Sequence, residues 1–170
     1  YDNAQIKTTY SNYEYKAGQY LPTSVSTRRK HPDDTLYFTM TDKFTYNNKG
    51  LKITETNLYG TSAETTTTFA YDYYGNVISN STSGTGVETI TTQYIYDSSN
   101  RFVTQSLERN YIKNVYTYDS WGNVLTASNQ TRSSYPLTTT NTYDDWVRLA
   151  TSTSPIVVTT TLEWKWDGNG

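Results

Sequence analysis

Residues 116–125 read Tyr-Thr-Tyr-Asp-Ser-Trp-Gly-Asn-Val-Leu, and related stretches recur along the chain. The second aromatic residue of each stretch falls at positions 46, 71, 96, 118, 143 and 166, so the steps are 25, 25, 22, 25 and 23 residues. A period in this range is typical of repeat proteins, in which each unit packs on its neighbours. The sequence therefore predicts a repeat architecture.

The residues of the repeat signature lie at the end of a strand or in the turn that follows it. They are Tyr46, Gly50, Tyr71, Asp72, Gly75, Tyr96, Asp97, Tyr118, Asp119, Gly122, Tyr143, Asp144, Trp166 and Asp167. An Asp at the first position of a turn accepts hydrogen bonds from nearby backbone N–H groups, and a Gly at the fourth position adopts a positive φ without steric cost. Each unit is therefore expected to be a β-hairpin with a type I turn and a glycine bulge.

Two units lack the glycine. Asn100 stands in its place in one unit, and Asn tolerates the left-handed region of the backbone. Val147 stands there in another unit, where a β-branched residue at positive φ would be strained. We therefore expect the turn over residues 144–147 to adopt a different type.

Residues of alternating character flank each turn. Before one turn, Thr92, Tyr94 and Tyr96 lie on one face of a predicted strand and Ile95 lies on the other. A return strand follows each turn, as at Val124-Leu125, so each period gives about two antiparallel strands and the chain has room for about 12. No segment carries a helical period, and the threonine-rich runs resist helix because branched side chains crowd the preceding turn.

The composition fits a sheet with little core. Hydrophobic residues make up 34% of the 170 residues, below the roughly 45–50% of ordinary globular proteins. The 18 tyrosines, together with abundant threonine, argue against disorder and favour strands. A sheet with one packed face, or a wall around a space, suits this composition better than a dense sandwich.

Charge and cysteine content narrow the classes of partner. The net charge of −2 and the scattered Lys and Arg residues argue against a nucleic-acid partner. The basic triplet Arg28-Arg29-Lys30 is followed by acidic residues, which favours a surface loop. With no cysteine, disulfides and cysteine-based metal sites are excluded. No run is apolar enough for a membrane span.

The organisation of the chain changes near residue 43. Residues 1–43 are expected to hold degenerate repeat units, with a loop insertion near 22–34. Residues 44–170 are expected to hold tandem repeats, truncated within the last one. The chain is accordingly interpreted as a piece of a longer protein.

The motif aromatic-x-Tyr-Asp-x-x-Gly-[Asn/Arg]-[Val/Leu] resembles the YD repeat of Rhs proteins, Tc-toxin shell subunits and teneurins. Residues 116–125 match it most fully, and Phe69 to Ile78 follow closely. One such motif arises easily by chance, but five or six in register are specific. The resemblance implies an all-β fold in which repeated antiparallel β-hairpins build one long curved sheet, with about two strands per 22–25-residue repeat.

The resemblance also implies a function. Shells of this family are thought, in bacteria, to enclose a toxic C-terminal segment of the same polypeptide. The expected function is thus a structural β-sheet wall that encloses a C-terminal toxin or effector polypeptide, without catalysis in this fragment. The expected partners are the neighbouring repeats and that C-terminal cargo, and the expected location is secreted or at the bacterial cell surface. The chain has no Asp-Pro dipeptide, so neither the family's self-cleavage motif nor the toxin is expected in it.

Other interpretations of the same residues remain open. The aromatic ladder could bind a glycan at a cell surface, but cross-strand aromatic packing is favoured, because a wall of one layer needs such a ladder. The repeated aspartates could suggest calcium, but the loops lack a dense run of alternating carboxylates, and each Asp has a role in its turn. His31 is the only histidine and sits in a charged loop, which argues against catalysis.

No catalytic, cofactor-binding or metal-binding residue is therefore assigned, and no cofactor is expected. Paired carboxylates brought together by folding are kept as a remote enzymatic alternative. A piece of a continuous sheet has unpaired edge strands, and such edges recruit other chains. We therefore expect the chain to be prone to edge-to-edge self-association.

Overall fold

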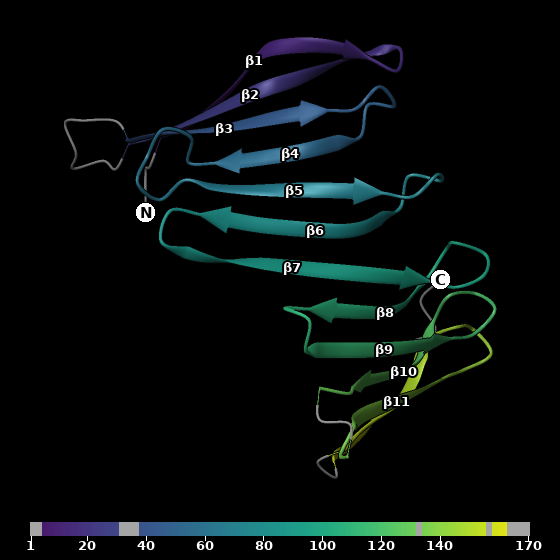
Figure 1. Ribbon diagram of the computed structural model, residues 1–170. Coiled ribbons are helices and arrows are strands. Elements are labelled where there is room, and N and C mark those ends of the chain that lie inside the picture. The colour runs from purple at the N-terminus through teal and green to yellow at the C-terminus, as the bar shows by residue number, and fades with distance from the viewer. Residues whose placement is uncertain (1–4, 31–37, 132–133, 156–157, 163–170) are drawn as a thin grey trace. The chain divides into compact units, whose positions relative to one another are not determined.

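The computed structural model describes residues 5–30, 38–131, 134–155 and 158–162, which form 13 β-strands (Figure 1). The strands follow one another in the sheet in chain order, from β1 to β13. Their bounds are β1 Gln5–Lys16, β2 Gln19–Lys30, β3 Phe38–Tyr46, β4 Lys52–Asn57, β5 Thr65–Tyr71, β6 Val77–Gly84, β7 Val87–Tyr96, β8 Val103–Glu108, β9 Ile112–Tyr118, β10 Val124–Asn129, β11 Leu137–Tyr143, β12 Leu149–Ser154 and β13 Val158–Thr161. The expected all-β fold of repeated antiparallel hairpins is confirmed, and the described residues include no helix.

The chain divides into two compact units, residues 1–91 and 92–170. The first unit holds β1 to β6 and the first part of β7, and its hairpins are β1–β2, β3–β4 and β5–β6. The second unit holds the end of β7 and β8 to β13, and its hairpins are β7–β8, β9–β10 and β11–β12. Each unit is therefore a series of antiparallel hairpins.

The hairpins of the repeat share an irregularity beside the turn. The register shifts at Thr45/Tyr46, Ala70/Tyr71, Ile95/Tyr96, Val124/Thr126 and Thr142/Tyr143. Such a bulge follows from a type I turn whose fourth residue has a left-handed backbone. The β1–β2 hairpin is different, because Ala17 (φ 49°) and Gly18 (φ 84°) make a tight two-residue turn between the paired Lys16 and Gln19.

Part of one prediction is wrong. Residues 22–30 belong to β2, although the sequence suggested a loop insertion near 22–34; residues 31–34 lie outside the described residues. Pro22 favoured the loop interpretation, since it cannot donate a ladder hydrogen bond. It pairs with Tyr13 of β1, whereas the pairing of β2 with β3 begins only at Ser24, so Pro22 lies where one side of β2 has no ladder partner.

The described residues contain no buried hydrophobic side chain; the buried side chains are Ser24 and Ser128, 6% and 8% exposed. The strands are joined by backbone hydrogen bonds, and pairs of hydroxyl groups on adjacent strands add to them, as cross-strand Thr pairs allow. Their oxygens lie 2.6–3.1 Å apart in Ser26–Thr41, Thr45–Thr54, Thr56–Thr66, Thr67–Thr82, Ser81–Thr91, Thr117–Thr126, Ser128–Thr138 and Thr142–Thr151. Low apolar content is thus matched by a sheet without a sealed core.

Candidate functional site: the aromatic-aspartate turns

Five turns of the repeat lie within the described residues, each between the two strands of a hairpin. We call them the first (47–50), second (72–75), third (97–100), fourth (119–122) and fifth (144–147) turns. The first and second belong to the first compact unit, and the other three to the second unit. Trp166 and Asp167, the last pair of the signature, lie outside the described residues.

The first residue of each turn uses its side-chain oxygen to bind the backbone of its own turn. In the fourth turn, Asp119 Oδ1 accepts the N–H groups of Trp121, Gly122 and Asn123, each at 2.9 Å. The backbone adds a bond from Gly122 N to Asp119 O at 3.2 Å. The carboxylate thus satisfies donors that a tight turn would leave without a partner.

The same arrangement recurs in the other turns. Asn47 Oδ1 accepts the N–H groups of Lys49 (2.9 Å) and Leu51 (3.0 Å) in the first turn. Asp72 Oδ1 accepts the N–H of Asn76 at 2.8 Å in the second turn. An amide therefore replaces the carboxylate in the first turn without loss of these two bonds.

The connection that contains the third turn is one residue longer than the others, because Tyr96 pairs with Val103 whereas, for example, Tyr118 pairs with Val124. The N–H groups of Arg101 and Phe102 donate to Asp97 Oδ1 at 2.8 and 3.0 Å, and the Ser99 hydroxyl donates to Asp97 Oδ2. Asn100, at the glycine position, has φ 56°, in the left-handed region that Asn tolerates.

The residue after the glycine position has a role that the sequence interpretation missed. Asn76 Nδ2 donates to Asp72 Oδ2 at 2.9 Å, and Asn123 Nδ2 donates to Asp119 Oδ2 at 2.7 Å. In the fifth turn, Arg148 does the same for Asp144, with Nε and Nη2 each 2.8 Å from Oδ2. The Asn/Arg position of the repeat motif was the available signal, because both residue types carry side-chain donors.

These hydrogen bonds favour the ionised carboxylates. The backbone N–H of Phe102 and the Ser99 hydroxyl lower the pKa of Asp97 to about 2. The Asn123 side chain lowers the pKa of Asp119, and the Arg148 backbone N–H lowers that of Asp144. For Asp72, desolvation acts in the opposite direction, but the hydrogen bonds from Asn76 and its turn neighbours still lower the pKa. The shared cause is hydrogen bonding to the charged form.

The fifth turn corrects a second prediction. The sequence predicts that Val147 forces a different turn type, yet its N–H bonds to Asp144 O at 2.9 Å, as at the glycine of the other turns. Its φ is +63°, beside +76° at Gly50 and +97° at Gly122. Trp146 and Arg148 also donate to Asp144 Oδ1, at 3.0 and 2.9 Å. The side-chain hydrogen bonds of Asp144 accompany a left-handed backbone that a β-branched residue ordinarily avoids.

Four of the repeat tyrosines bind the preceding hairpin through their hydroxyl groups. The acceptors are backbone carbonyls at or near the start of a return strand: Tyr46 to Pro22 (2.9 Å), Tyr71 to Lys52 (2.5 Å), Tyr118 to Val103 (2.7 Å) and Tyr143 to Val124 (3.0 Å). Partial burial raises the pKa of Tyr46, Tyr71 and Tyr118. Tyr96 is half-buried at the end of β7 and pairs with Val103. The tyrosines thus form polar links between successive hairpins.

Ring packing reinforces one of these links. The rings of Phe102 and Tyr118 are stacked, with centroids 5.1 Å apart and an interplanar angle of 25°. A Cβ atom at Gly122 would lie 2.6 Å from Cε1 and Cζ of Phe102, so any other residue there would have to displace the Phe102 ring from its place beside Tyr118. Gly75 is less constrained, since a Cβ atom there would lie 3.5 Å from Leu51 Cδ1.

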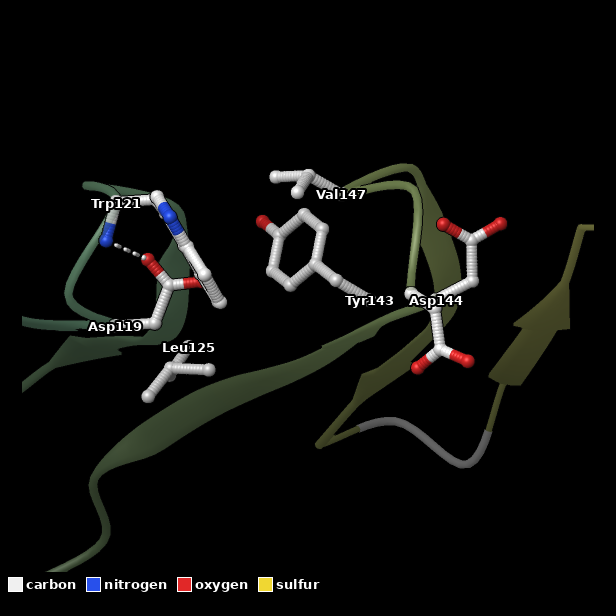
Figure 2. Close-up of a pocket in the computed structure, with 7 residues that line it drawn as sticks. Asp119, Trp121, Leu125, Tyr143, Asp144 and Val147 are labelled. Atoms are coloured by element: carbon white, nitrogen blue, oxygen red, sulfur yellow. Dashed lines mark hydrogen bonds between the residues drawn. The ribbon is translucent and has the colours of Figure 1, made fainter.

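Two cavities open between adjacent turns of the second unit. One, of about 370 Å³, lies between the fourth and fifth turns and is shown in Figure 2. Its lining comprises Asp119, Trp121, Leu125, Tyr143, Asp144, Asp145 and Val147. The other, of about 470 Å³, lies between the third and fourth turns and includes Arg101, Phe102 and Tyr118 in its lining. These cavities depend on residues outside the signature, such as Trp121 and Asp145.

Two further observations concern a metal site and a membrane span, which were also considered from the sequence. Groups of three or more His, Asp or Glu side chains placed to hold a metal ion are absent from the described ranges. Across those ranges, no helix is long and apolar enough to cross a membrane.

No protein-family model matches the sequence, and no curated protein sequence matches it. Similar solved structures include the Tc holotoxin pore of Photorhabdus luminescens, at 16% identity and a TM-score of 0.44, covering 78% of this chain and 8% of that chain. They also include TcdB2–TccC3 without its hypervariable C-terminal region (18% identity, TM-score 0.45, 86% of this chain and 9% of that chain) and TcdB2–TccC3 (17% identity, TM-score 0.43, 78% and 9%). The chain therefore spans less than a tenth of these Tc-toxin chains.

Proposed function

We propose that this chain is a section of a structural wall built from YD-type hairpin repeats. The observation that carries the proposal is a recurring hydrogen bond from a repeat tyrosine hydroxyl to a carbonyl of the preceding hairpin, made by Tyr46, Tyr71, Tyr118 and Tyr143. The described strands have no buried hydrophobic side chain, so each hairpin depends on its neighbours. Stability that passes from neighbour to neighbour is typical of repeat proteins, which extend by adding units.

The role of the wall rests on the resemblance of its motif to YD repeats. We infer that it helps to enclose a C-terminal toxin or effector polypeptide of the same gene product, and that the product is secreted by bacteria or displayed on their surface. The wall needs no chemistry of its own for this role. The turn aspartates are already engaged in hydrogen bonds within their turns.

Protease protection of the natural gene product that contains this sequence tests enclosure. The purified protein is treated with a nonspecific protease, and the C-terminal segment is followed by mass spectrometry. We expect that segment to survive in the native protein but to be digested when it is produced alone. Equal digestion of the two samples would contradict enclosure and leave only the repeat wall.

Glycan binding is a second candidate, favoured by exposed aromatic residues at the tips of the turns. Tyr73, Trp121 and Trp146 are 84%, 76% and 79% exposed, unlike the half-buried tyrosines of the ladder. A glycan array compares the chain with its Trp121→Ala/Trp146→Ala variant. Hits that vanish in the variant would support the second candidate, and an array without hits would reject it.

Self-association through sheet edges is also proposed. β1 is a 12-residue strand at one end of the strand order, and no described strand pairs with its outer side. An unpaired edge of this length is a template for pairing with another chain. Light scattering should show mass increasing with concentration, and a Thr9→Pro variant should reduce the increase. A monomer at every concentration would reject this proposal.

A further inference from the structure

The β1–β2 hairpin holds two tyrosine rings against each other beside its turn. Tyr15 of β1 and Tyr20 of β2 are directly opposite partners in the ladder, on either side of the tight turn at Ala17 and Gly18. Side chains at such positions have Cβ atoms about 4.5–5.5 Å apart. The two ring centroids lie 5.0 Å apart, with an angle of 57° between the ring planes. The register of the hairpin therefore keeps two phenol groups next to each other.

Both rings of this pair face solvent. Tyr15 is 62% exposed and Tyr20 is 72% exposed. The repeat tyrosines differ, because Tyr118, for example, is half-buried and its hydroxyl donates to the Val103 carbonyl. Exposed side chains change rotamer within nanoseconds, so the edges of the Tyr15 and Tyr20 rings can meet. The pair is thus open to small solutes and free to rotate into edge-to-edge contact.

Another close tyrosine pair has a geometry less suited to a covalent bond. Tyr73 and Tyr74 are consecutive residues of the second turn, with ring centroids 5.5 Å apart and an interplanar angle of 87°. This arrangement directs the edge of one ring at the face of the other. A bond between these two rings would also join no two strands.

A bond between Tyr15 and Tyr20 would tie an edge strand to its neighbour. Within the described part of the sheet, β1 pairs with β2 and with no other strand. Strands at the end of a sheet open locally more easily than strands at its centre, because they have fewer partners. The chain has no cysteine, so a disulfide cannot make this connection.

We propose that Tyr15 and Tyr20 are a site of oxidative cross-linking, at which hydrogen peroxide and a haem peroxidase convert the two side chains into dityrosine. Each phenol first loses one electron and its hydroxyl proton and becomes a tyrosyl radical. A carbon–carbon bond then forms between the ring carbons next to the oxygen-bearing carbons. The hydrogen on each newly bonded carbon moves to the oxygen, which restores both phenols. Hydrogen peroxide accepts the two electrons and two protons and becomes two molecules of water.

The sequence offers a direct test, because trypsin cleaves between the two residues, after Lys16. The whole chain is treated with hydrogen peroxide and a haem peroxidase, digested with trypsin and analysed by mass spectrometry. We expect peptides 8–16 and 17–28 to be joined, with a mass two hydrogen atoms below their sum and with the fluorescence of dityrosine. Tyr20 is the only tyrosine of peptide 17–28, whereas peptide 8–16 contains Tyr10, Tyr13 and Tyr15.

Two variants and a mixing experiment identify the partner of Tyr20. Tyr15→Phe should abolish the joined peptide. Tyr13→Phe is the matched control, since Tyr13 is 55% exposed and lies on the same face two residues away, but pairs with Pro22. This control should give the yield of the wild type. A mixture of isotope-labelled and unlabelled chains should give joined peptides that carry the label in both halves or in neither.

The outcomes distinguish this inference from the wall proposal. Absence of the joined peptide, its persistence in Tyr15→Phe, or its loss in Tyr13→Phe would each overturn the cross-linking site. Joined peptides with one labelled half would show coupling between chains and would overturn it as well. None of these results bears on protease protection of the C-terminal segment, which tests enclosure separately.

Discussion

The fourth and fifth turns have the same backbone hydrogen bonds but differ in the residue at the fourth position. Gly122 has φ +97° and Val147 has φ +63°, and the N–H of each donates to the first Asp of its turn. In both turns the Asp Oδ1 accepts the N–H groups of the third and fifth residues. The comparison indicates that the hydrogen bonds to the first side chain define this turn, and that glycine at the fourth position lowers its backbone strain.

Packing explains why glycine is needed in one turn and not in the other. The Phe102 ring covers Gly122 so closely that a Cβ atom would have to displace it. Val147 instead lines an open cavity, together with Leu125 and Tyr143. In the fourth turn, the Phe102 ring covers the glycine. In the fifth turn, the larger Val147 side chain lies beside an open cavity.

The largest effect is expected when the fourth turn receives the residue of the fifth. Gly122→Val should lower the free energy of unfolding by about 3–4 kcal/mol, because left-handed strain adds to overpacking against Phe102. Gly75→Val should lower it by only about 1–2 kcal/mol, because a Cβ atom there meets Leu51 at an ordinary distance. Urea unfolding measures both variants. Equal losses would show that the Phe102 contact has no part in the difference.

Acid should weaken the four described turns that begin with an aspartate. Hydrogen bonds lower the pKa of Asp72, Asp119 and Asp144 in the folded state, and that of Asp97 to about 2. Because the folded pKa lies below the unfolded value of about 3.9, the stabilisation is complete above that value and is lost as pH falls toward 2. Urea midpoints measured across this range should decrease. The Asp97→Asn variant should show a flatter decrease, and an unchanged slope would contradict the role of Asp97.

The hydrogen bonds of the repeat tyrosines should contribute an intermediate amount to the free energy of unfolding. Tyr118→Phe removes the hydrogen bond to the Val103 carbonyl but keeps the ring stacked on Phe102, so a loss of about 1 kcal/mol is expected. Tyr143→Phe should cost a similar amount. Tyr111→Phe is the control, since that side chain is 57% exposed. Equal unfolding midpoints for Tyr118→Phe and Tyr111→Phe would argue against the links between hairpins.

The smallest effect should come from giving the fifth turn its missing glycine. Val147→Gly relieves the strain of the left-handed backbone but raises the conformational entropy of the unfolded chain. The free energy of unfolding is therefore expected to rise by about 0.5–1 kcal/mol. Val147→Asn, which introduces the residue type that Asn100 supplies in the third turn, should fall between the wild type and the glycine variant. Thermal unfolding measures both. A loss of stability in Val147→Gly would mean that the valine contacts outweigh the strain.

The regular part of the fold could be predicted from the sequence because it is local. The spacing of aromatic and aspartate residues places the strand ends and turns, and alternation supplies the strands. Val147 was misjudged because propensity gives the cost of a left-handed valine but not the hydrogen bonds of Asp144 that accompany it. The strand at residues 22–30 was missed because an edge position that tolerates Pro22 is a property of the assembled sheet.

The candidate site was less accessible from the sequence. The sequence identified the role of the aspartates in their turns. It identified Asn123 and Arg148 as positions of the repeat motif, but not as hydrogen-bond donors to the aspartates. The cavity between the fourth and fifth turns brings together Trp121, Asp145 and Val147 from two hairpins. Its existence depends on which side chain covers each turn, and no local pattern encodes that relation.

Amide hydrogen exchange, resolved by residue, tests the central claim most directly. If the aspartate defines the turn, the N–H groups of Asn123 and Arg148, both bound to an Asp Oδ1 at 2.9 Å, should be protected to a similar degree. If glycine defines it, Asn123 will be protected while Arg148 exchanges at the rate of an open loop. That second result would contradict the account.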